Sequence, residues 1–520
     1  MSDEQCVGRR EFLRQAGRIA GAGVALPYVF SLTGNQPTLT YHRDSSSALP
    51  KFQGQISFYA QAYTPQHATK SNPHPPTKFF EVAARYEKMH PNIKIKFLPA
   101  NLGGTNYPGW VTTEAAGGTL PDITWNQWGQ VNTGYYPKGI YVNLKPYLLR
   151  PNPYVAGNKR WIDLFNPRIM QEITSPLDGG IYAVDGDYVG TAIYYVRDHF
   201  RKIGVKKLPH TWKDFMAIHD QLKRHGFTPF GFDLSSDGLL PAWWDRKMLV
   251  EFFEPRLSEF DVDHNQYYAT ILDYAVGVKK GLFTMKNPAF QEVWKLLKDW
   301  SRYWAPGATT INMSAPGQVT SGVSAVQLFM QGKVSMVWDG TWLVPTLDAL
   351  GFNGHYGVFT LPIVTKETTP FSNNINYQGV VGGPNAAFQY FVASPHADHN
   401  MTPARLAWCI DWLQYISTPE NAGAIVNDLG AFIPTIKGAK VRNSIVRSLI
   451  PTWRVPTSIE GPFSAAPTPQ SLSQGVRLLQ EYIQGSVDWS GFSTQFESII
   501  QQSVDQWAAK NHVDLNKYLR

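Results

Sequence analysis

The chain has 520 residues, of which 43% are hydrophobic and 17% are charged, as is typical of a globular protein rather than a disordered chain or a coiled coil. Basic residues exceed acidic ones by seven, but no run of five like charges occurs, so nucleic-acid or membrane-surface binding has little support. Two cysteines, Cys6 and Cys409, exclude a disulfide framework and a structural zinc site. No apolar segment after the first 35 residues is long enough to predict a transmembrane helix.

The N-terminal segment is typical of an export signal. Arg9 and Arg10 stand just before Phe12 and a weakly apolar stretch rich in glycine and alanine. This pattern predicts a twin-arginine-type signal over residues 1–34, which a receptor reads on an already folded protein. An amphipathic first helix is the alternative. The polar residues 35–50 then form a predicted linker, and the mature domain is expected to begin near Lys51.

The first part of the mature chain alternates between strand and helix patterns. Residues 55–59 read as a strand, and residues 77–89 follow as an amphipathic helix that Thr77 can cap. Residues 93–97 alternate between apolar side chains and lysines, and 122–125 form another short apolar run. This order predicts crossover units on a parallel sheet.

Further along the chain, helix starts are marked by capping residues. Residues 191–196 predict a strand, and Thr211 with Asp214 forms a capping box that opens a helix ending near Gly226. A proline after a capping residue predicts three more helix starts, and short apolar runs predict two more strands. The helix starts are Asn287-Pro288, Thr402-Pro403 and Thr418-Pro419, and the strands are 334–338 and 356–361.

Five stretches in a fixed order carry a family resemblance. They are 115–125 (AAGGTLPDITW), 194–215, 325–342 (AVQLFMQGKVSMVWDGTW), 356–362 with Gly382-Gly383, and 404–434 ending in LGAFIP. Each stretch by itself is only a weak match to a family, but the order of the five stretches over some 300 residues is specific. The chain thereby resembles the extracellular solute-binding proteins of bacterial ABC importers, family 1, the carbohydrate-binding branch that includes maltose-binding protein.

The resemblance implies an α/β protein with the two-lobe periplasmic-binding-protein fold of type II, hinge crossovers and an inter-lobe ligand cleft. The first lobe is expected to take 51–187 plus 386–430, and the second 188–380 plus 435–520. The hinge crossings are expected near 182–188, 376–383 and 430–434. Ligand that contacts both lobes would favour a closed form.

A sugar needs flat aromatic groups for its C–H faces and planar polar groups for its hydroxyl edge. Several segments that follow predicted strands or lie near the expected crossings offer such groups. The predicted ligand-binding residues are Trp338, Asp339, Trp342, Trp125, Asn126, Gln127, Tyr59, Gln61, Asp187, Tyr188, Gly382, Gly383 and Trp243. Core tryptophans, a turn aspartate, a hinge tyrosine and a tight glycine turn are the alternatives, and for Trp243 packing is favoured over ligand contact.

The sequence features that would indicate other functions are weaker. Asp261, Asp263 and Asn265 match the start of a calcium loop, but Gln266 and Leu272 stand where a full EF-hand needs glycine and glutamate. A glycoside hydrolase or polysaccharide lyase would need two carboxylates, which Asp339 could supply with Asp187 or Asp122. A surface adhesin or lectin without transport is a third class.

The sequence and the resemblance together predict an exported, non-enzymatic carbohydrate-binding protein. It is expected to be a monomer that delivers a sugar or oligosaccharide to the permease subunits of an ABC importer. No catalytic residue, metal, cofactor or nucleic-acid partner is expected, and the protein would act in a periplasm or at a cell surface.

Overall fold

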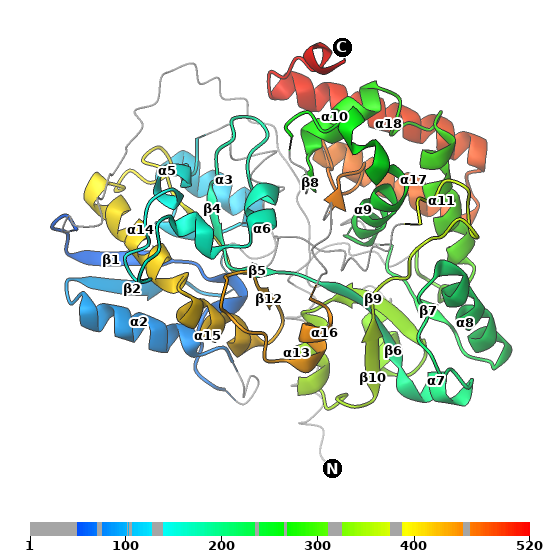
Figure 1. Ribbon diagram of the computed structural model, residues 1–520, viewed down its shortest axis with the longest axis horizontal. Coiled ribbons are helices and arrows are strands. Elements are labelled where there is room, and N and C mark those ends of the chain that lie inside the picture. Colours follow the sequence, from blue (N-terminus) through cyan, green and yellow to red (C-terminus); the bar gives the residue numbers. More distant parts are fainter. Residues whose placement is uncertain are drawn as a thin grey trace. The chain divides into compact units, whose positions relative to one another are not determined.

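The chain divides into two compact units. Unit 1 comprises the residues up to Val189 together with Gly383–Arg447, and unit 2 comprises Gly190–Gly382 together with Ser448–Arg520. The computed structural model describes residues 49–69, 75–100, 102, 107–126, 139–234, 239–264, 268–309, 325–374, 387–450 and 458–519 (Figure 1). The predicted export signal, most of the predicted linker, Gln127, Gly382 and Gly383 lie outside these residues.

Unit 1 is built on one mixed sheet. Its five strands run in the order β2-β1-β3-β11-β4, with β1 parallel to β2 and β3 and with β11 antiparallel to β3 and β4. The strands of this unit are β1 Gly54–Phe58, β2 Ile93–Phe97, β3 Ile123–Trp125, β4 Ala183–Asp185, β11 Gln389–Val392 and the separate pair β5 Asp187–Tyr188 with β12 Ile433–Pro434. The helices are η1 Gln61–Tyr63, α2 Lys78–Met89, α3 Tyr107–Gly117, α5 Lys145–Leu148, η5 Trp161–Leu164, α6 Pro167–Glu172, α14 Pro403–Ile416, α15 Pro419–Leu429 and α16 Ser444–Ser448.

The predicted crossover order is confirmed in unit 1, because β1, α2 and β2 form a parallel strand–helix–strand unit. Phe58, Phe79, Tyr390 and Trp412 join the sheet to its helices, with ring centroids of Phe58 and Phe79 5.4 Å apart. The prediction that the Thr77 side chain caps α2 is wrong. Thr77 makes no side-chain cap bond; instead the Asp428 carboxylate accepts from the backbone N–H groups of Thr77 and Lys78.

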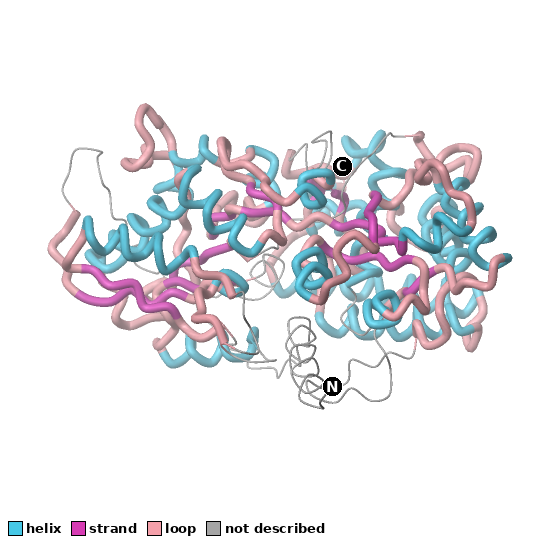
Figure 2. The backbone as a smooth tube through the Cα atoms, turned by 90° about the horizontal axis from the view of Figure 1, so that it is seen from below, coloured by secondary structure: helices cyan, strands magenta, loops and turns pink. Residues whose placement is uncertain are grey.

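Unit 2 has a smaller sheet and more helix. Its four strands run in the order β10-β6-β9-β7, with β6 antiparallel to β10 and β9 and with β7 parallel to β9. The strands are β6 Thr191–Val196, β7 Phe230–Gly231, β9 Met336–Gly340, β10 Tyr356–Phe359 and the separate pair β8 Tyr268–Ala269 with β13 Ser458–Ile459. Figure 2 shows helices on both sides of the strands in each unit.

The helices of unit 2 pack around a tryptophan-rich core. Trp300 lies 4.6 Å from Phe230, 5.4 Å from Trp212 and 5.7 Å from Trp244, measured between ring centroids. The helices are α7 Arg197–Lys202, α8 Trp212–Arg224, α9 Leu239–Phe253, η6 Glu254–Glu259, α10 Ile271–Lys279, α11 Pro288–Ser301, α12 Ala325–Met330, α13 Leu343–Ala349, α17 Pro469–Gln484, α18 Trp489–Lys510 and η7 Leu515–Tyr518. In the described ranges, no helix combines the length and the apolar character that crossing a membrane requires.

Most predicted helix starts in both units are confirmed by their caps. Thr211 and Asp214 form the full capping box of α8, and Asn287, Thr402 and Thr418 each cap the helix that begins at the following proline. One difference concerns residues 435–447, which lie with unit 1 rather than with the predicted second lobe. Ile436 bridges to Phe165, and the Lys437 N–H donates to the Leu164 carbonyl, so this stretch packs on η5.

Candidate functional site

The segment Trp338–Trp342 completes the central strand of the unit 2 sheet. Strand β9 is buried between β6 and β7 and ends at Gly340, and the next residue, Thr341, donates its N–H to the Gly190 carbonyl at 2.8 Å. Gly190 is the residue at which the chain enters unit 2. The best sequence candidate therefore lies at a strand end and directly beside this crossing of the chain.

Three indoles gather there. Trp243 lies 5.6 Å from Trp338 and 5.8 Å from Trp342, measured between ring centroids. Trp243 and Trp338 are buried, whereas Trp342 and Asp339 keep part of their surface exposed. We call Trp243, Trp338, Asp339 and Trp342 the unit 2 patch. Because Trp243 and Trp338 are buried, only Trp342 and Asp339 of this patch are partly accessible to solvent.

Gly340 holds the Trp342 ring close to the backbone. A Cβ atom at position 340 would lie 2.4 Å from the six-membered ring of Trp342, so only glycine leaves room for the indole there. The ring is thus fixed against the turn, which is the arrangement that a stacking surface for a sugar face requires.

Burial disfavours the charged form of the Asp339 carboxyl, whereas two hydrogen-bond donors favour it. Burial raises its pKa to about 7, although the Gly340 N–H, 2.7 Å away, and the Trp342 indole oppose this rise. Two polar atoms on the same segment, Trp338 Nε1 and Thr341 Oγ1, are buried without a hydrogen-bond partner. Such groups are costly unless a ligand or water satisfies them.

Unit 1 carries a second aromatic group at the ends of its parallel strands. Tyr107 of α3 lies 5.3 Å from Tyr59, which follows β1, 5.7 Å from Trp125 at the end of β3, and 5.6 Å from Trp110. We call Tyr59, Tyr107, Trp110 and Trp125 the unit 1 patch. Sequence reasoning found Tyr59 and Trp125 but missed Tyr107 and Trp110, whose three-residue spacing on a helix was the available signal.

Both tyrosine hydroxyls of the unit 1 patch have hydrogen-bond partners within the protein. The Tyr59 hydroxyl donates to the Ala100 carbonyl at 3.2 Å, and the Tyr107 hydroxyl donates to the Trp125 carbonyl at 2.5 Å.

Two further predicted ligand-binding residues of unit 1, Gln61 and Asn126, differ in their exposure. Gln61 is partly exposed and has a left-handed backbone with φ 52°, whereas Asn126 is fully buried and donates to the Tyr141 hydroxyl at 3.1 Å.

Asp187 and Tyr188 form β5, immediately before the chain leaves unit 1, and both are buried. The Tyr63 hydroxyl donates to the Asp187 carboxylate at 2.6 Å, and the Phe388 N–H donates to it at 2.9 Å. Burial raises the pKa of Asp187 to about 7 and that of Asp185 well above its usual range. A Cβ at Gly186, between the two aspartates, would lie 2.3 Å from the Phe388 ring, so the strands approach closely here.

Asp122, a candidate for a hydrolase carboxylate pair, belongs to a structural clamp. Its fully buried carboxylate accepts from the N–H of Ser57 at 2.8 Å, from the Ser57 hydroxyl at 2.6 Å and from the Arg405 guanidinium. These bonds tie β1, β3 and α14 together. Every oxygen of Asp122 is therefore occupied by the fold.

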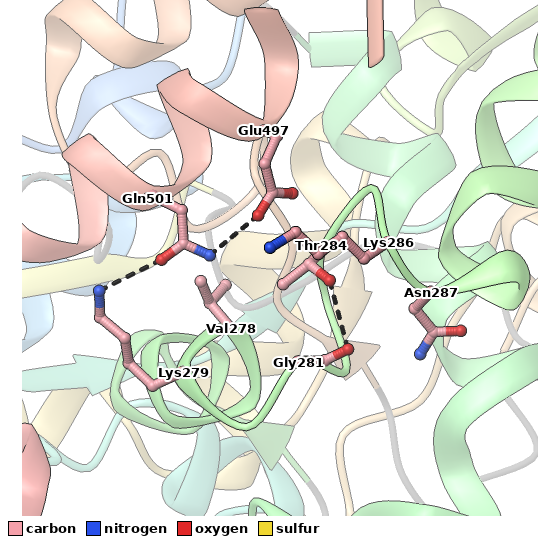
Figure 3. Close-up of a pocket in the computed structure, with 8 residues that line it drawn as sticks. All are labelled: Val278, Lys279, Gly281, Thr284, Lys286, Asn287, Glu497 and Gln501. Atoms are coloured by element: carbon pink, nitrogen blue, oxygen red, sulfur yellow. Dashed lines mark hydrogen bonds between the residues drawn. The ribbon is translucent and has the colours of Figure 1, made fainter. Parts of the chain in front are cut away.

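A pocket of about 370 Å³ lies elsewhere in unit 2, between α10, the turn after it and α18 (Figure 3). The Gln501 amide bridges Lys279 and Glu497, with distances of 3.2 and 3.1 Å, and Glu497 also accepts from the Met285 N–H. None of the predicted site residues lines this pocket. Because these lining groups bond to one another, the pocket is a poor candidate for ligand capture.

The segment that partly matches a calcium loop brings three carboxylates together. Ligand oxygens of Asp261, Asp263 and Asp273 lie within 4.8 Å of one another. Asp273 was not among the loop positions in the sequence match, and it also accepts from the N–H groups of Val262 and Thr270. Asp273 is the N3 residue of the capping box of α10, so its carboxylate already has a structural role.

Comparison with known proteins identifies the class. Residues 81–446 match the family of bacterial extracellular solute-binding proteins, and this chain belongs to that family. A protein of Brucella abortus named only as a binding protein is 24% identical over 306 residues, which are 57% of this chain and 61% of that protein. An uncharacterized ABC transporter extracellular-binding protein of Pyrococcus horikoshii is 22% identical, over 63% of this chain and 67% of that one.

Solved structures have the same fold. A chitin oligosaccharide binding protein aligns with a TM-score of 0.61 and 17% identity, over 87% of this chain and 99% of its own. A cyclic alpha-maltosyl-1,6-maltose binding protein of Arthrobacter globiformis aligns with a TM-score of 0.58 and 14% identity, over 87% and 100%. The resemblance drawn from the sequence is confirmed: the two units form the two-lobe α/β fold of solute-binding proteins.

Proposed function

We propose that this protein is the exported receptor of an ABC importer for a carbohydrate, which it binds with the aromatic patches of both units. One observation supports this most: Trp342 and Asp339 are partly exposed residues at a strand end, and the Trp342 indole hydrogen-bonds to the Asp339 carboxyl. An indole suits the face of a sugar ring, and a carboxylate suits its hydroxyl edge. Family membership supports the transport role.

The remaining features of the proposal follow the sequence prediction. A twin-arginine-type signal over residues 1–34 exports the chain, which acts as a monomer in the periplasm or at the cell surface and passes its ligand to the permease subunits. Ligand contact with both patches favours a closed form. The protein performs no chemistry on the ligand, and the sugar-binding neighbours named above support this reading over a hydrolase or lyase.

The test is thermal unfolding of the full chain against a panel of mono- and oligosaccharides, with sugar products assayed in the same wells. A ligand that binds only the native state raises the melting temperature as its concentration passes Kd. A concentration-dependent rise for one sugar without product supports the proposal. Conversion of a sugar would replace it with the hydrolase alternative, and a flat response to every sugar would refute carbohydrate binding.

A further inference from the structure

Some carboxylates of low exposure form ion pairs, whereas Asp339, like Asp187, accepts hydrogen bonds from neutral donors. Asp122 pairs with Arg405, Glu251 with Lys247 and Glu460 with Arg246. In the described part of the chain, no lysine, arginine or histidine forms an ion pair with Asp339. A carboxylate in low-dielectric surroundings is costly to ionise without an opposite charge nearby.

The groups around Asp339 are those that attract a cation. The faces of indole rings carry partial negative charge and bind ammonium groups, and the Trp342 indole, which hydrogen-bonds to the Asp339 carboxyl, lies 5.8 Å from the Trp243 ring. The nearest titratable group from β6 is Tyr194, whose hydroxyl donates to the Gly340 carbonyl at 2.8 Å and brings no positive charge. The unit 2 patch thus combines a carboxylate and aromatic faces without a protein cation.

We propose that the Asp339–Trp342 part of the unit 2 patch binds a protonated amine carried on a sugar ring. This inference rests on the proposed function, since it names the class of carbohydrate that the same site takes. A neutral hydroxyl can donate to Asp339, but it leaves the charge uncompensated once the ligand excludes water. An ammonium supplies the opposite charge, and its C–H-bearing ring stacks on Trp342.

Calorimetric titration of the full chain with matched sugar pairs tests this inference. Each pair has the same ring and linkage and differs only in an amine against a hydroxyl, for example glucosamine against glucose oligomers, and galactosamine against galactose. We expect the amine member of the bound pair to bind at least about tenfold more tightly. Tetramethylammonium alone serves as a third arm, because tight binding of this ion would show that the site recognises a cation without a sugar.

Two variants separate a charge effect from a general one. Asp339→Asn keeps the shape but removes the charge, so we expect it to abolish the amine preference while changing the affinity for the hydroxyl member only slightly. Glu367→Gln, at an exposed ion pair with Lys213 in the same unit, is the control and should keep the preference. Both variants are checked for cooperative thermal unfolding in the absence of ligand.

The outcomes are distinct. Equal or tighter binding of the hydroxyl member, or an amine preference that survives Asp339→Asn, would overturn the inference and leave the proposed function standing. Tight binding of tetramethylammonium without sugar selectivity would also overturn it. No binding by either member of any pair would refute carbohydrate binding itself, and this inference with it.

Discussion

The two aromatic patches differ in how their polar atoms are satisfied. In unit 1, the hydroxyls of Tyr59 and Tyr107 donate to backbone carbonyls, so these two side chains offer ring surface with their hydroxyls already hydrogen-bonded. In unit 2, Trp338 Nε1 and Thr341 Oγ1 are buried without partners, and Asp339 lacks a cation in the described chain. The difference suggests that unit 1 contributes apolar contact area and that unit 2 sets ligand selectivity.

The largest expected difference concerns two aspartates. Asp122→Asn in unit 1 should lower the free energy of unfolding by about 3 kcal/mol, because it breaks a buried ion pair with Arg405. Asp339→Asn in unit 2 should instead raise it by up to about 3 kcal/mol at pH 6, because the neutral amide removes the cost of a carboxyl whose pKa burial raises to about 7. Guanidinium unfolding followed by tryptophan fluorescence measures both. Equal costs would contradict the assignment of one carboxylate to the fold and the other to the ligand.

The pH dependence of stability sharpens the comparison for the buried aspartate of unit 1. Burial raises the folded-state pKa of Asp187 to about 7, above its unfolded value, so its neutral form favours folding. The corresponding stability is present below about pH 4 and is lost as the pH rises through about 7, and each pH unit between these two values removes about 1.4 kcal/mol. Asp187→Asn should therefore reduce the slope of the unfolding free energy by about 1.4 kcal/mol per pH unit between about pH 4 and 7. An unchanged slope would show that Asp187 is ionised throughout this range.

Two partly exposed indoles, one from each patch, should differ in their effect on ligand affinity. Trp342→Ala removes the fixed stacking surface of unit 2 and should weaken sugar binding by about 2 kcal/mol, or roughly thirtyfold. Trp110→Ala removes a partly exposed ring of unit 1 and should cost about 1 kcal/mol. Calorimetric titration of the bound sugar compares them. A larger loss from Trp110→Ala would assign the main contact to unit 1.

The smallest effect isolates one hydrogen bond. In unit 1, the Trp161 indole donates to the Ser417 hydroxyl at 2.7 Å, whereas the Trp338 indole of unit 2 has no partner. Replacing either tryptophan with phenylalanine removes similar volume, so Trp161→Phe should cost about 1 kcal/mol more than Trp338→Phe in unfolding free energy. If the ligand accepts from Trp338 Nε1, only Trp338→Phe should also weaken sugar binding. Matching unfolding costs would mean that the Trp161 bond adds no net stability.

The sequence alone predicted local structure well wherever side-chain pattern and capping act over a few residues. The alternation in 93–97, the capping box at Thr211 and the proline-led start at Thr402 each predicted an element that is present. The order of motifs also predicted the family, because motif order is carried by the chain itself. Four of the elements it left unpredicted are the helices α9, α13, α17 and α18 of unit 2.

Tertiary structure decided which candidate side chains are available to a ligand. Trp338 and Trp342 look alike in the sequence, yet Trp338 lies within the buried strand β9, whereas Trp342 lies beyond its end and is partly exposed, with its ring close to Gly340. Pairs of residues far apart in the chain have no local sequence signal either. Examples are the bonds of Asp428 to the start of α2, of Tyr63 to Asp187 and of Arg405 to Asp122. Short-range periodicity specifies elements, but burial and pairing between residues far apart in the chain arise only when those elements pack.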